Sequence, residues 1–163
     1  MKYILVLFLG LTGLTASAKD YPASLFGIRS DGLTLNTRSI QFAIDYVNSN
    51  GGGRLVFDVG RYLTGSIHLK SNVTIILKEG AVLVGSLNPF DYDKLMMTAL
   101  IFAYNQHDVS IEGKGVIDGQ GRQLAVNVTD IYHKGLIKNL FRNDRPEADI
   151  RAMLINTGNA VTY

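Results

Sequence analysis

Short apolar runs, separated by glycine, asparagine and charged residues, fill the chain from residue 51 onward. Two stretches repeat one pattern: Ser71–Ser86 (SNVTIILKEGAVLVGS) and His107–Gly121 (HDVSIEGKGVIDGQG). Each begins with a polar pair, passes through a β-branched run and a Lys/Glu/Gly turn, and continues with a second apolar run. Strands this short cannot bury an apolar face alone, whereas stacked copies can. The repeat therefore predicts an all-β solenoid, a right-handed parallel β-helix.

The strands expected from this pattern are Arg54–Asp58, Gly65–Leu69, Val73–Leu77, Ala81–Val84, Ala99–Ala103, Val109–Glu112 and Gly115–Ile117. A β-sandwich also produces short alternating runs, but hairpin dipeptides such as Asn-Gly commonly join its strands. No Asn-Gly pair occurs within either repeat. The solenoid is therefore the favoured interpretation, and we expect residues 54–163 to form the first coils of a parallel β-helix.

An amphipathic helix is predicted ahead of the strands, over Asn36–Asn50. Its apolar residues recur with the spacing of one helix face: Ile40, Ala43, Ile44 and Val47. Asn36 or Thr37 can cap the N-terminus, and Gly51 can end the helix. A core helix packed on a sheet needs the same pattern, but ahead of a solenoid the helix is expected to cover the first coil. Residues 19–53 are therefore predicted to be an N-terminal capping segment.

The first eighteen residues have the pattern of a signal peptide. Lys2 supplies a positive charge, Ile4–Leu14 an apolar run, and Ala16-Ser17-Ala18 a small-residue cleavage site. The apolar run is short for a bilayer span, and no stop-transfer pattern follows it. We therefore expect residues 1–18 to be removed on export to the periplasm or the extracellular space, which leaves a chain with no membrane span.

The composition excludes some classes of partner. The 163-residue chain has 16 Lys and Arg against 14 Asp and Glu, a formal net charge of +2. This near-neutrality argues against bulk electrostatic attraction to nucleic acid or to a membrane surface. The chain has no cysteine, so an exported form must be stabilised by packing rather than by disulfides.

Six segments, taken in order, carry a family resemblance: Gly27–Gly32 (GIRSDG), Asn36–Asp45 (NTRSIQFAID), Gly51–Phe57 (GGGRLVF), Gly60–Ile67 (GRYLTGSI), Leu69–Val73 (LKSNV) and Gly113–Gly119 (GKGVIDG). Together they resemble the N-terminal part of the polygalacturonase-like pectin hydrolases, glycoside hydrolase family 28. The resemblance covers the chain from Tyr21 to Leu154. It implies a secreted right-handed parallel β-helix, inverting hydrolysis of glycosidic bonds in pectic polysaccharide, and no metal or organic cofactor.

The resemblance assigns no catalytic residue in this chain. Inverting hydrolysis needs carboxyl groups on both sides of the scissile bond, about 6.5–9.5 Å apart. The family it resembles carries its catalytic groups in Asn-Thr-Asp, Asp-Asp, Gly-His-Gly and Arg-Ile-Lys motifs on later coils, and this sequence contains none of the four. Asn156-Thr157, for example, is followed by Gly158. We therefore expect the N-terminal portion of such a hydrolase, truncated before its catalytic coils and inactive alone; the alternative is a non-catalytic β-helix that binds polysaccharide or serves as a structural module.

Lys138, Arg142 and Arg145 are the candidate substrate-binding residues. Uronate sugars carry carboxylates, and the guanidinium group of arginine can bind a carboxylate through two parallel hydrogen bonds. A solvated surface loop has the same composition, and the residues alone favour that interpretation.

Two further pairs contain groups able to hold a metal ion or to transfer a proton. Asp91 and Asp93 could hold Ca²⁺, as a pectate lyase would require, although aspartate is common in solvated turns. Asp130 and His133 stand at i and i+3 and could form an acid–base pair, although a surface ion pair or a helix-end contact suits them better. In both cases the structural interpretation is favoured, so no metal site is predicted.

The remaining polar candidates are isolated in the sequence. His68 alternates with apolar neighbours and is expected to face outward from a strand, while His107 is expected in a turn. Neither has a sequence partner that would mark it as a catalytic base. Asn72 and Asn127 begin glycosylation sequons, but Asn72 is better explained as a residue at a corner between coils.

Overall fold

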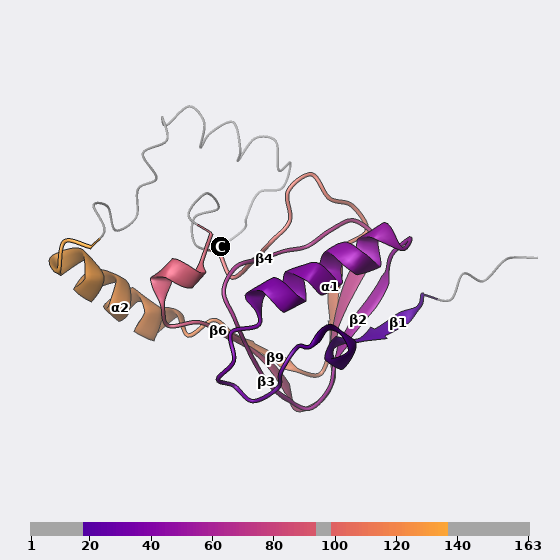
Figure 1. The fold of residues 1–163 in the computed structure, drawn as a ribbon, viewed down its shortest axis with the longest axis horizontal. Coiled ribbons are helices and arrows are strands. Elements are labelled where there is room, and N and C mark those ends of the chain that lie inside the picture. The colour runs from indigo at the N-terminus through magenta and orange to yellow at the C-terminus, as the bar shows by residue number, and fades with distance from the viewer. Residues whose placement is uncertain (1–17, 94–98, 137–163) are drawn as a thin grey trace, which may run out of the picture.

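Parallel β-strands form the body of the chain, whose computed structural model describes residues 18–93 and 99–136 (Figure 1). The helices of this part are the 3₁₀ helix η1 (Ala23–Phe26), α1 (Thr37–Ser49), the 3₁₀ helix η2 (Pro89–Asp91) and α2 (Gly121–His133). The strands are β1 (Asp20–Pro22), β2 (Gly53–Phe57), β3 (Gly60–Thr64), β4 (Ile67–His68), β5 (Val73–Leu77), β6 (Ala81–Gly85), β7 (Ile101–Phe102), β8 (Ser110–Gly113) and β9 (Val116–Asp118).

From β2 onward, strands three places apart in the chain pair with each other, so the chain winds in stacked coils; β1 pairs with β2. Sheet A has the order β1-β2-β5-β8, sheet B the order β3-β6-β9, and sheet C consists of β4 and β7. Every one of these pairings is parallel. This is the topology of a parallel β-helix, and it confirms the stacked parallel strands predicted from the repeat. The right-handed sense of the coils stays a prediction.

Equivalent residues of successive coils stack in register inside the helix. Leu55 of β2 pairs with Ile75 of β5, which pairs with Ile111 of β8. A second ladder joins Tyr62, Leu83 and Ile117. The exposed fraction along the first ladder is 0%, 1% and 38%, because each coil is covered by the one that follows it in the stack. Burial of an isoleucine side chain contributes about 1.5–3 kcal/mol, so the buried members of these ladders stabilise the stacking of the coils.

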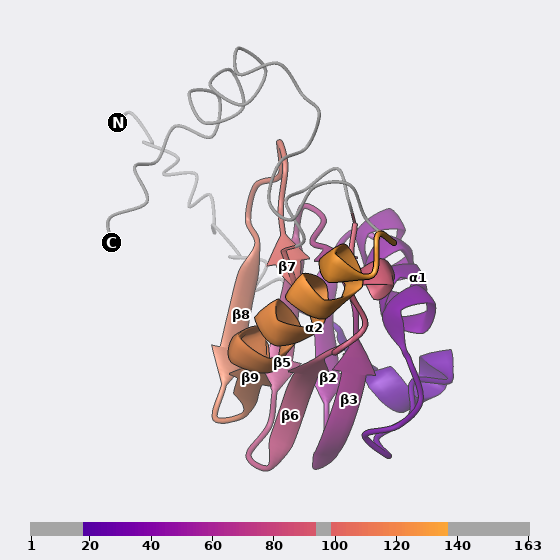
Figure 2. The same ribbon diagram turned by 90° about the vertical axis from the view of Figure 1, so that its left-hand side faces the viewer.

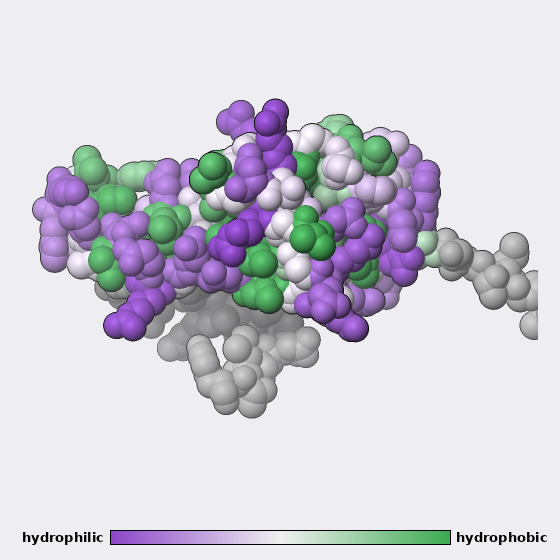
Figure 3. All heavy atoms as spheres, turned by 90° about the horizontal axis from the view of Figure 1, so that it is seen from below, coloured by the Kyte–Doolittle hydropathy of each residue, from purple (hydrophilic) through white to green (hydrophobic). Residues whose placement is uncertain are grey.

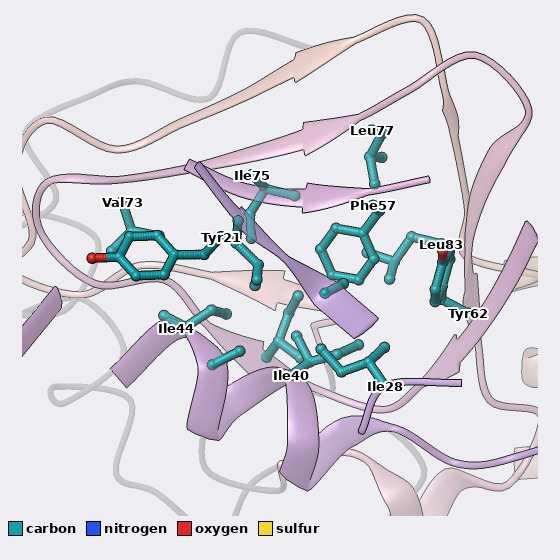
Figure 4. Packing of buried hydrophobic residues seen from close by; sticks show 14 of the residues in the cluster. Tyr21, Ile28, Ile40, Ile44, Phe57, Tyr62, Val73, Ile75, Leu77 and Leu83 are labelled. Atoms are coloured by element: carbon teal, nitrogen blue, oxygen red, sulfur yellow. The ribbon is translucent and has the colours of Figure 1, made fainter. Parts of the chain in front are cut away.

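Helix α1 packs its apolar face on the first coil. Four residues at helical spacing are 0% exposed: Ile40, Ala43, Ile44 and Val47. Ile40 and Ile44 point toward Phe57 and Ile75 in the core (Figure 4). The predicted helix is therefore present, one residue shorter at each end than expected.

Polar side chains along one flank of α1 bond to the backbone of the first coil. The hydroxyl oxygen of Thr37 accepts a hydrogen bond from the backbone N–H of Gly65 at 2.7 Å. Farther along, the side-chain amide of Asn48 donates to the carbonyl oxygen of Ser71 at 2.8 Å. Figure 2 shows α1 beside β2 and β3 at one end of the stack, with β8 and β9 at the opposite end.

Two strands, one α-helix and the two short 3₁₀ helices were not among the predicted elements, and two predicted strands are shorter. β1 and β3 are strands that the apolar pattern did not identify, and α2 is a helix in a region expected to form coils. No residue of α2 is buried, and Leu124, Val128 and Ile131 form only a half-buried stripe. This apolar pattern is weaker than that of the short strands before it, so the sequence did not indicate a helix here. The stretches expected at Gly65–Leu69 and Ala99–Ala103 contain only the two-residue strands β4 and β7.

The outer surface mixes polar and apolar side chains. In the view from below in Figure 3, apolar side chains form small groups that polar residues separate. Within the ranges described, no helix is both long enough and apolar enough to cross a membrane.

Candidate functional site

The predicted substrate-binding residues Lys138, Arg142 and Arg145 lie outside the described residues. The sites that can be built from the structure therefore come from the coils and from α2. Sheet C contributes a histidine–aspartate pair, the η2 turn contributes a network of side chains, and α2 contributes a surface depression.

His68 faces outward from β4, as its alternation with apolar neighbours predicts. Its side chain is 41% exposed, and its Nε2 lies 3.2 Å from Oδ2 of Asp93. Phe102 is its in-register neighbour on β7, and the two ring centroids are 3.7 Å apart. The imidazole is thus held between a carboxylate and an aromatic ring on the outer face of sheet C.

The pair combines a ring that carries one donor and one acceptor nitrogen when neutral with a carboxylate that accepts hydrogen bonds. The backbone beneath it is fixed, because the side-chain amide of Gln41 bonds to both the N–H and the C=O of His68. Sequence reasoning treated His68 as isolated, since its partner Asp93 lies 25 positions away and only the fold brings them together.

Asp91 and Asp93 do not converge on a common point for a cation. The carboxylate of Asp91 accepts hydrogen bonds from the hydroxyl of Ser86 and, at 3.1 Å, from the side-chain amide of Asn88. The carboxylate of Asp93 faces His68 instead. Across residues 18–93 and 99–136, no group of three or more His, Cys, Asp or Glu residues is arranged to hold a metal ion. Asp91 therefore takes part in the η2 turn, and Asp93 contacts a histidine of sheet C.

Tyr92 is buried beside this turn. Its hydroxyl donates a hydrogen bond to the carbonyl oxygen of Ser86 at 2.7 Å, and the residue is 5% exposed. Burial, with a smaller contribution from the charge of Asp91, raises the pKa of Tyr92 to about 12. The phenol therefore stays protonated at neutral pH and anchors the loop to the end of β6.

Asp130 and His133 do not form the acid–base pair that their spacing allows. Asp130 instead accepts a hydrogen bond from Nζ of Lys134 at 2.6 Å, in an exposed i, i+4 ion pair. His133 stacks obliquely near Tyr132, with ring centroids 5.9 Å apart. Both residues line a shallow, open depression on α2, together with Ala125, Val126 and Thr129. The surface ion pair is the interpretation confirmed for Asp130.

The other polar candidates have structural partners. Nδ1 of His107 lies 3.0 Å from Oδ2 of the adjacent Asp108, and both side chains are well exposed. Asn72 adopts a left-handed backbone at a φ of 62°, which confirms it as a corner residue between coils. The side-chain amide of Asn127 donates to the carbonyl oxygen of Leu87 at 2.9 Å and ties α2 to the loop after β6.

Comparison with curated proteins relates the chain to enzymes that act on galacturonan. No protein-family model matches it. It is 33% identical over 137 residues to an exo-poly-α-D-galacturonosidase of Dickeya chrysanthemi, across 73% of this chain and 22% of that one. It is 36% identical over 126 residues to a protein of Vitis vinifera assigned as a polygalacturonase, across 64% of this chain and 26% of that one. The chain thus spans about a quarter of the length of these relatives.

Comparison with solved structures gives the same relationship. A Parabacteroides merdae protein assigned as a glycosyl hydrolase superposes with a TM-score of 0.70 and 54% identity, across 74% of this chain and 53% of that one. The Family 28 exopolygalacturonase of Yersinia enterocolitica superposes with a TM-score of 0.55 and 35% identity, across 64% of this chain and 21% of that one. These matches agree with the resemblance carried by the six sequence segments. The chain is a polygalacturonase-like protein related to glycoside hydrolase family 28.

Proposed function

We propose that this chain supplies the N-terminal coils of an exported polygalacturonase-like hydrolase that acts on pectic polysaccharide. The observation that carries the proposal is the 33% identity to an exo-poly-α-D-galacturonosidase, found in a chain that folds into in-register parallel coils. Export rests on the signal-like pattern of residues 1–18, and α1 has the role of closing the N-terminal end of the stack.

The substrate in this proposal is an anionic sugar chain, and sheet C offers a surface for it. His68, 41% exposed and packed on Phe102, presents an N–H donor beside an aromatic ring on the outer face. An imidazole N–H can donate a hydrogen bond to a uronate carboxylate, and the aromatic ring offers apolar contact to a sugar. Lys138, Arg142 and Arg145 remain the proposed cationic contacts contributed from later in the chain.

We further propose that the chain hydrolyses nothing by itself. Two of the candidate carboxylates have structural partners: Asp91 bonds to Asn88 in the η2 turn, and Asp130 forms an ion pair with Lys134. The four catalytic motifs of the related hydrolases do not occur in its sequence. The same observation favours a second candidate, a non-catalytic β-helix module that binds pectic polysaccharide or has a structural role.

A chimera distinguishes the two candidates. The matching N-terminal coils of the Yersinia enterocolitica exopolygalacturonase are replaced by residues 19–136 of this chain, and reducing ends released from polygalacturonate are measured. If the chain supplies hydrolase coils, the chimera is active, the isolated chain releases no reducing ends, and a chimera carrying Ile75→Asp in the core is inactive. If the chimera is inactive although folded, and the isolated chain still binds polygalacturonate in affinity electrophoresis, the binding-module candidate is correct. Turnover by the isolated chain would contradict both.

A further inference from the structure

The face of α1 that points away from the sheets carries exposed aromatic side chains. Phe42 is 61% and Tyr46 43% exposed, although the opposite face of the same helix is fully buried. Successive helical residues are rotated by about 100°, so Arg38 and Asp45 share the outward face with Phe42. Since α1 lies at the end of the stack, this face is turned away from the coils (Figure 2).

The aromatic side chains on this face form one connected cluster. Phe26 of η1 contacts both helix residues, with ring centroids 6.2 Å from Phe42 and 5.5 Å from Tyr46. Phe42 and Tyr46 lie 6.4 Å apart, and Leu25, which precedes Phe26, is 73% exposed. These contacts hold the rings in place before any partner binds, which lowers the entropic cost of association. Clustered exposed apolar side chains of this kind mark an interaction surface.

Two opposite charges flank Phe42 along the helix. Arg38 and Asp45 are seven residues apart, two helical turns on the same face, and the midpoint between them falls beside Phe42. Arg38 is exposed and takes part in no ion pair within residues 18–93 and 99–136. Oδ1 of Asp45 accepts a hydrogen bond from Gln41 at 3.1 Å, which orients the carboxylate on the helix surface.

A two-fold axis through that midpoint makes the face complementary to itself. Rotation about the axis sets two helices antiparallel and brings Arg38 of one copy opposite Asp45 of the other, twice. Phe42 of each copy then lies next to the axis, where the two rings contact each other. An isologous interface requires this property, that one patch carries both halves of each contact.

We propose that two copies of this chain associate through the outward face of α1, antiparallel, with Phe42 at the two-fold axis and an Arg38–Asp45 ion pair on each side. A partner of single-sign charge, such as an anionic polysaccharide, would match only half of this pattern. The contact covers one helix face and its flanking 3₁₀ helix, so the dimer dissociates reversibly and belongs with the small, transient interfaces.

Sedimentation velocity of the full exported chain over a concentration series, without polysaccharide, tests the proposal. The expected result is a monomer–dimer equilibrium that Phe42→Ser shifts toward monomer by about tenfold or more in dissociation constant. The matched control is Val59→Ser, which removes another exposed apolar side chain, 73% exposed in the β2–β3 turn, and is expected to leave the equilibrium unchanged. Circular dichroism of each variant verifies that the fold is retained.

Exchanging the charges of Arg38 and Asp45 tests the two-fold arrangement itself, which removal of an apolar side chain does not test. Arg38→Asp and Asp45→Arg each place like charges opposite one another twice, and each is expected to weaken the dimer about tenfold. The double variant Arg38→Asp/Asp45→Arg restores opposite charges across the axis and is expected to return the dissociation constant to within about twofold of the original.

Three outcomes would overturn the proposal. A chain that stays monomeric at all concentrations has no such interface. A dimer that is unaffected by Phe42→Ser but lost in Ile117→Asp pairs through the exposed end of β8 and β9 instead. Failure of the double charge variant to recover association would show that the helices are not related by this axis. None of these outcomes bears on the proposed hydrolase function, because no polysaccharide is present in the experiment.

Discussion

The side-chain amide of Gln41 pairs with both backbone polar groups of His68. Its Oε1 accepts the N–H of His68 at 2.8 Å, and its Nε2 donates to the C=O at 3.1 Å. A residue on a neighbouring strand would supply the same two bonds. β4 has β7 on one side only in sheet C, so Gln41 occupies the other edge and α1 covers a strand edge that would otherwise be open to other chains.

We expect Gln41→Ala to destabilise the protein by about 1–3 kcal/mol, because it leaves the N–H and C=O of His68 without their partner in a partly buried position. Urea unfolding followed by circular dichroism measures the loss as a lower midpoint at constant slope. Amide exchange at His68 should become faster. Ser49→Ala is the control, since Ser49 is an exposed residue of the same helix. Equal midpoints for the two variants would contradict the edge-covering role of Gln41.

The second prediction uses two isoleucines that occupy equivalent positions in successive coils. Ile75 and Ile111 pair in register, but Ile75 is 1% exposed and Ile111 is 38% exposed. Ile75→Ala should cost about 2–5 kcal/mol, because it removes buried methyl groups and leaves a cavity between coils. Ile111→Ala should cost clearly less, because part of that side chain is already in water.

Calorimetric or urea unfolding of the two variants tests this difference directly, since the substitution is chemically identical. If Ile111→Ala is as costly as Ile75→Ala, Ile111 of β8 is covered in solution to the same extent as Ile75 of β5, which would contradict the exposure of this end of the stack.

The repeated apolar runs located the middle of the fold. Val73–Leu77 was predicted with the observed bounds from its β-branched and apolar run, and in the structure its residues alternate between positions that are 0–3% exposed and positions that are partly buried. The same signal failed for α2. The apolar stripe of α2 is only half-buried, and a helix with no fully buried face has a weak apolar periodicity in its sequence.

The contacts of the candidate site were beyond the reach of the sequence. Alternation placed His68 on the outer face of a strand, but it could not say what lies across from it. Asp93 follows η2, and Phe102 lies on β7 in the next coil. Both residues are far from His68 in the sequence, so only the fold shows that they contact it. The predicted contacts at Lys138, Arg142 and Arg145 stay predictions, because they lie outside the described residues.

The third prediction concerns the backbone at Gly113, the last residue of β8. Its φ is +114°, and a Cβ at this position would overlap the carbonyl oxygen of Leu77 in the coil beneath. Gly113→Ala should therefore destabilise the protein by about 1–3 kcal/mol through the backbone conformation, with the overlap added to that.

Gly119→Ala is the matched control, because a Cβ there meets no atom within 4 Å. Thermal unfolding of the two variants should separate them by several degrees for a chain of this size. A Gly113→Ala variant as stable as the Gly119→Ala variant would mean that β8 does not stack on β5 as closely as their register requires.

The last prediction is a loss of stability in acid that depends on Asp31. Its carboxylate accepts hydrogen bonds from the backbone N–H of Thr34 at 2.8 Å, the hydroxyl of Thr34 at 2.7 Å and the backbone N–H of Leu33 at 2.9 Å. These bonds, led by the one from the backbone of Thr34, lower the pKa of Asp31 from 3.8 to about 2.

Because the pKa is lower in the folded state, the unfolded chain binds more protons between these two values. The stabilisation from Asp31 is therefore complete above about pH 4 and is lost as the pH falls through about 2. Asp31→Asn removes the titrating group, so the urea midpoint of the variant should fall less steeply over this range than that of the unmodified chain. Thr34→Val removes only the hydroxyl donor and should raise the pKa of Asp31, measured by NMR titration of its carboxyl carbon. An Asp31 that titrates at the ordinary value of 3.8 in the folded protein would show that the loop Asp31–Thr34 does not hold this conformation in solution.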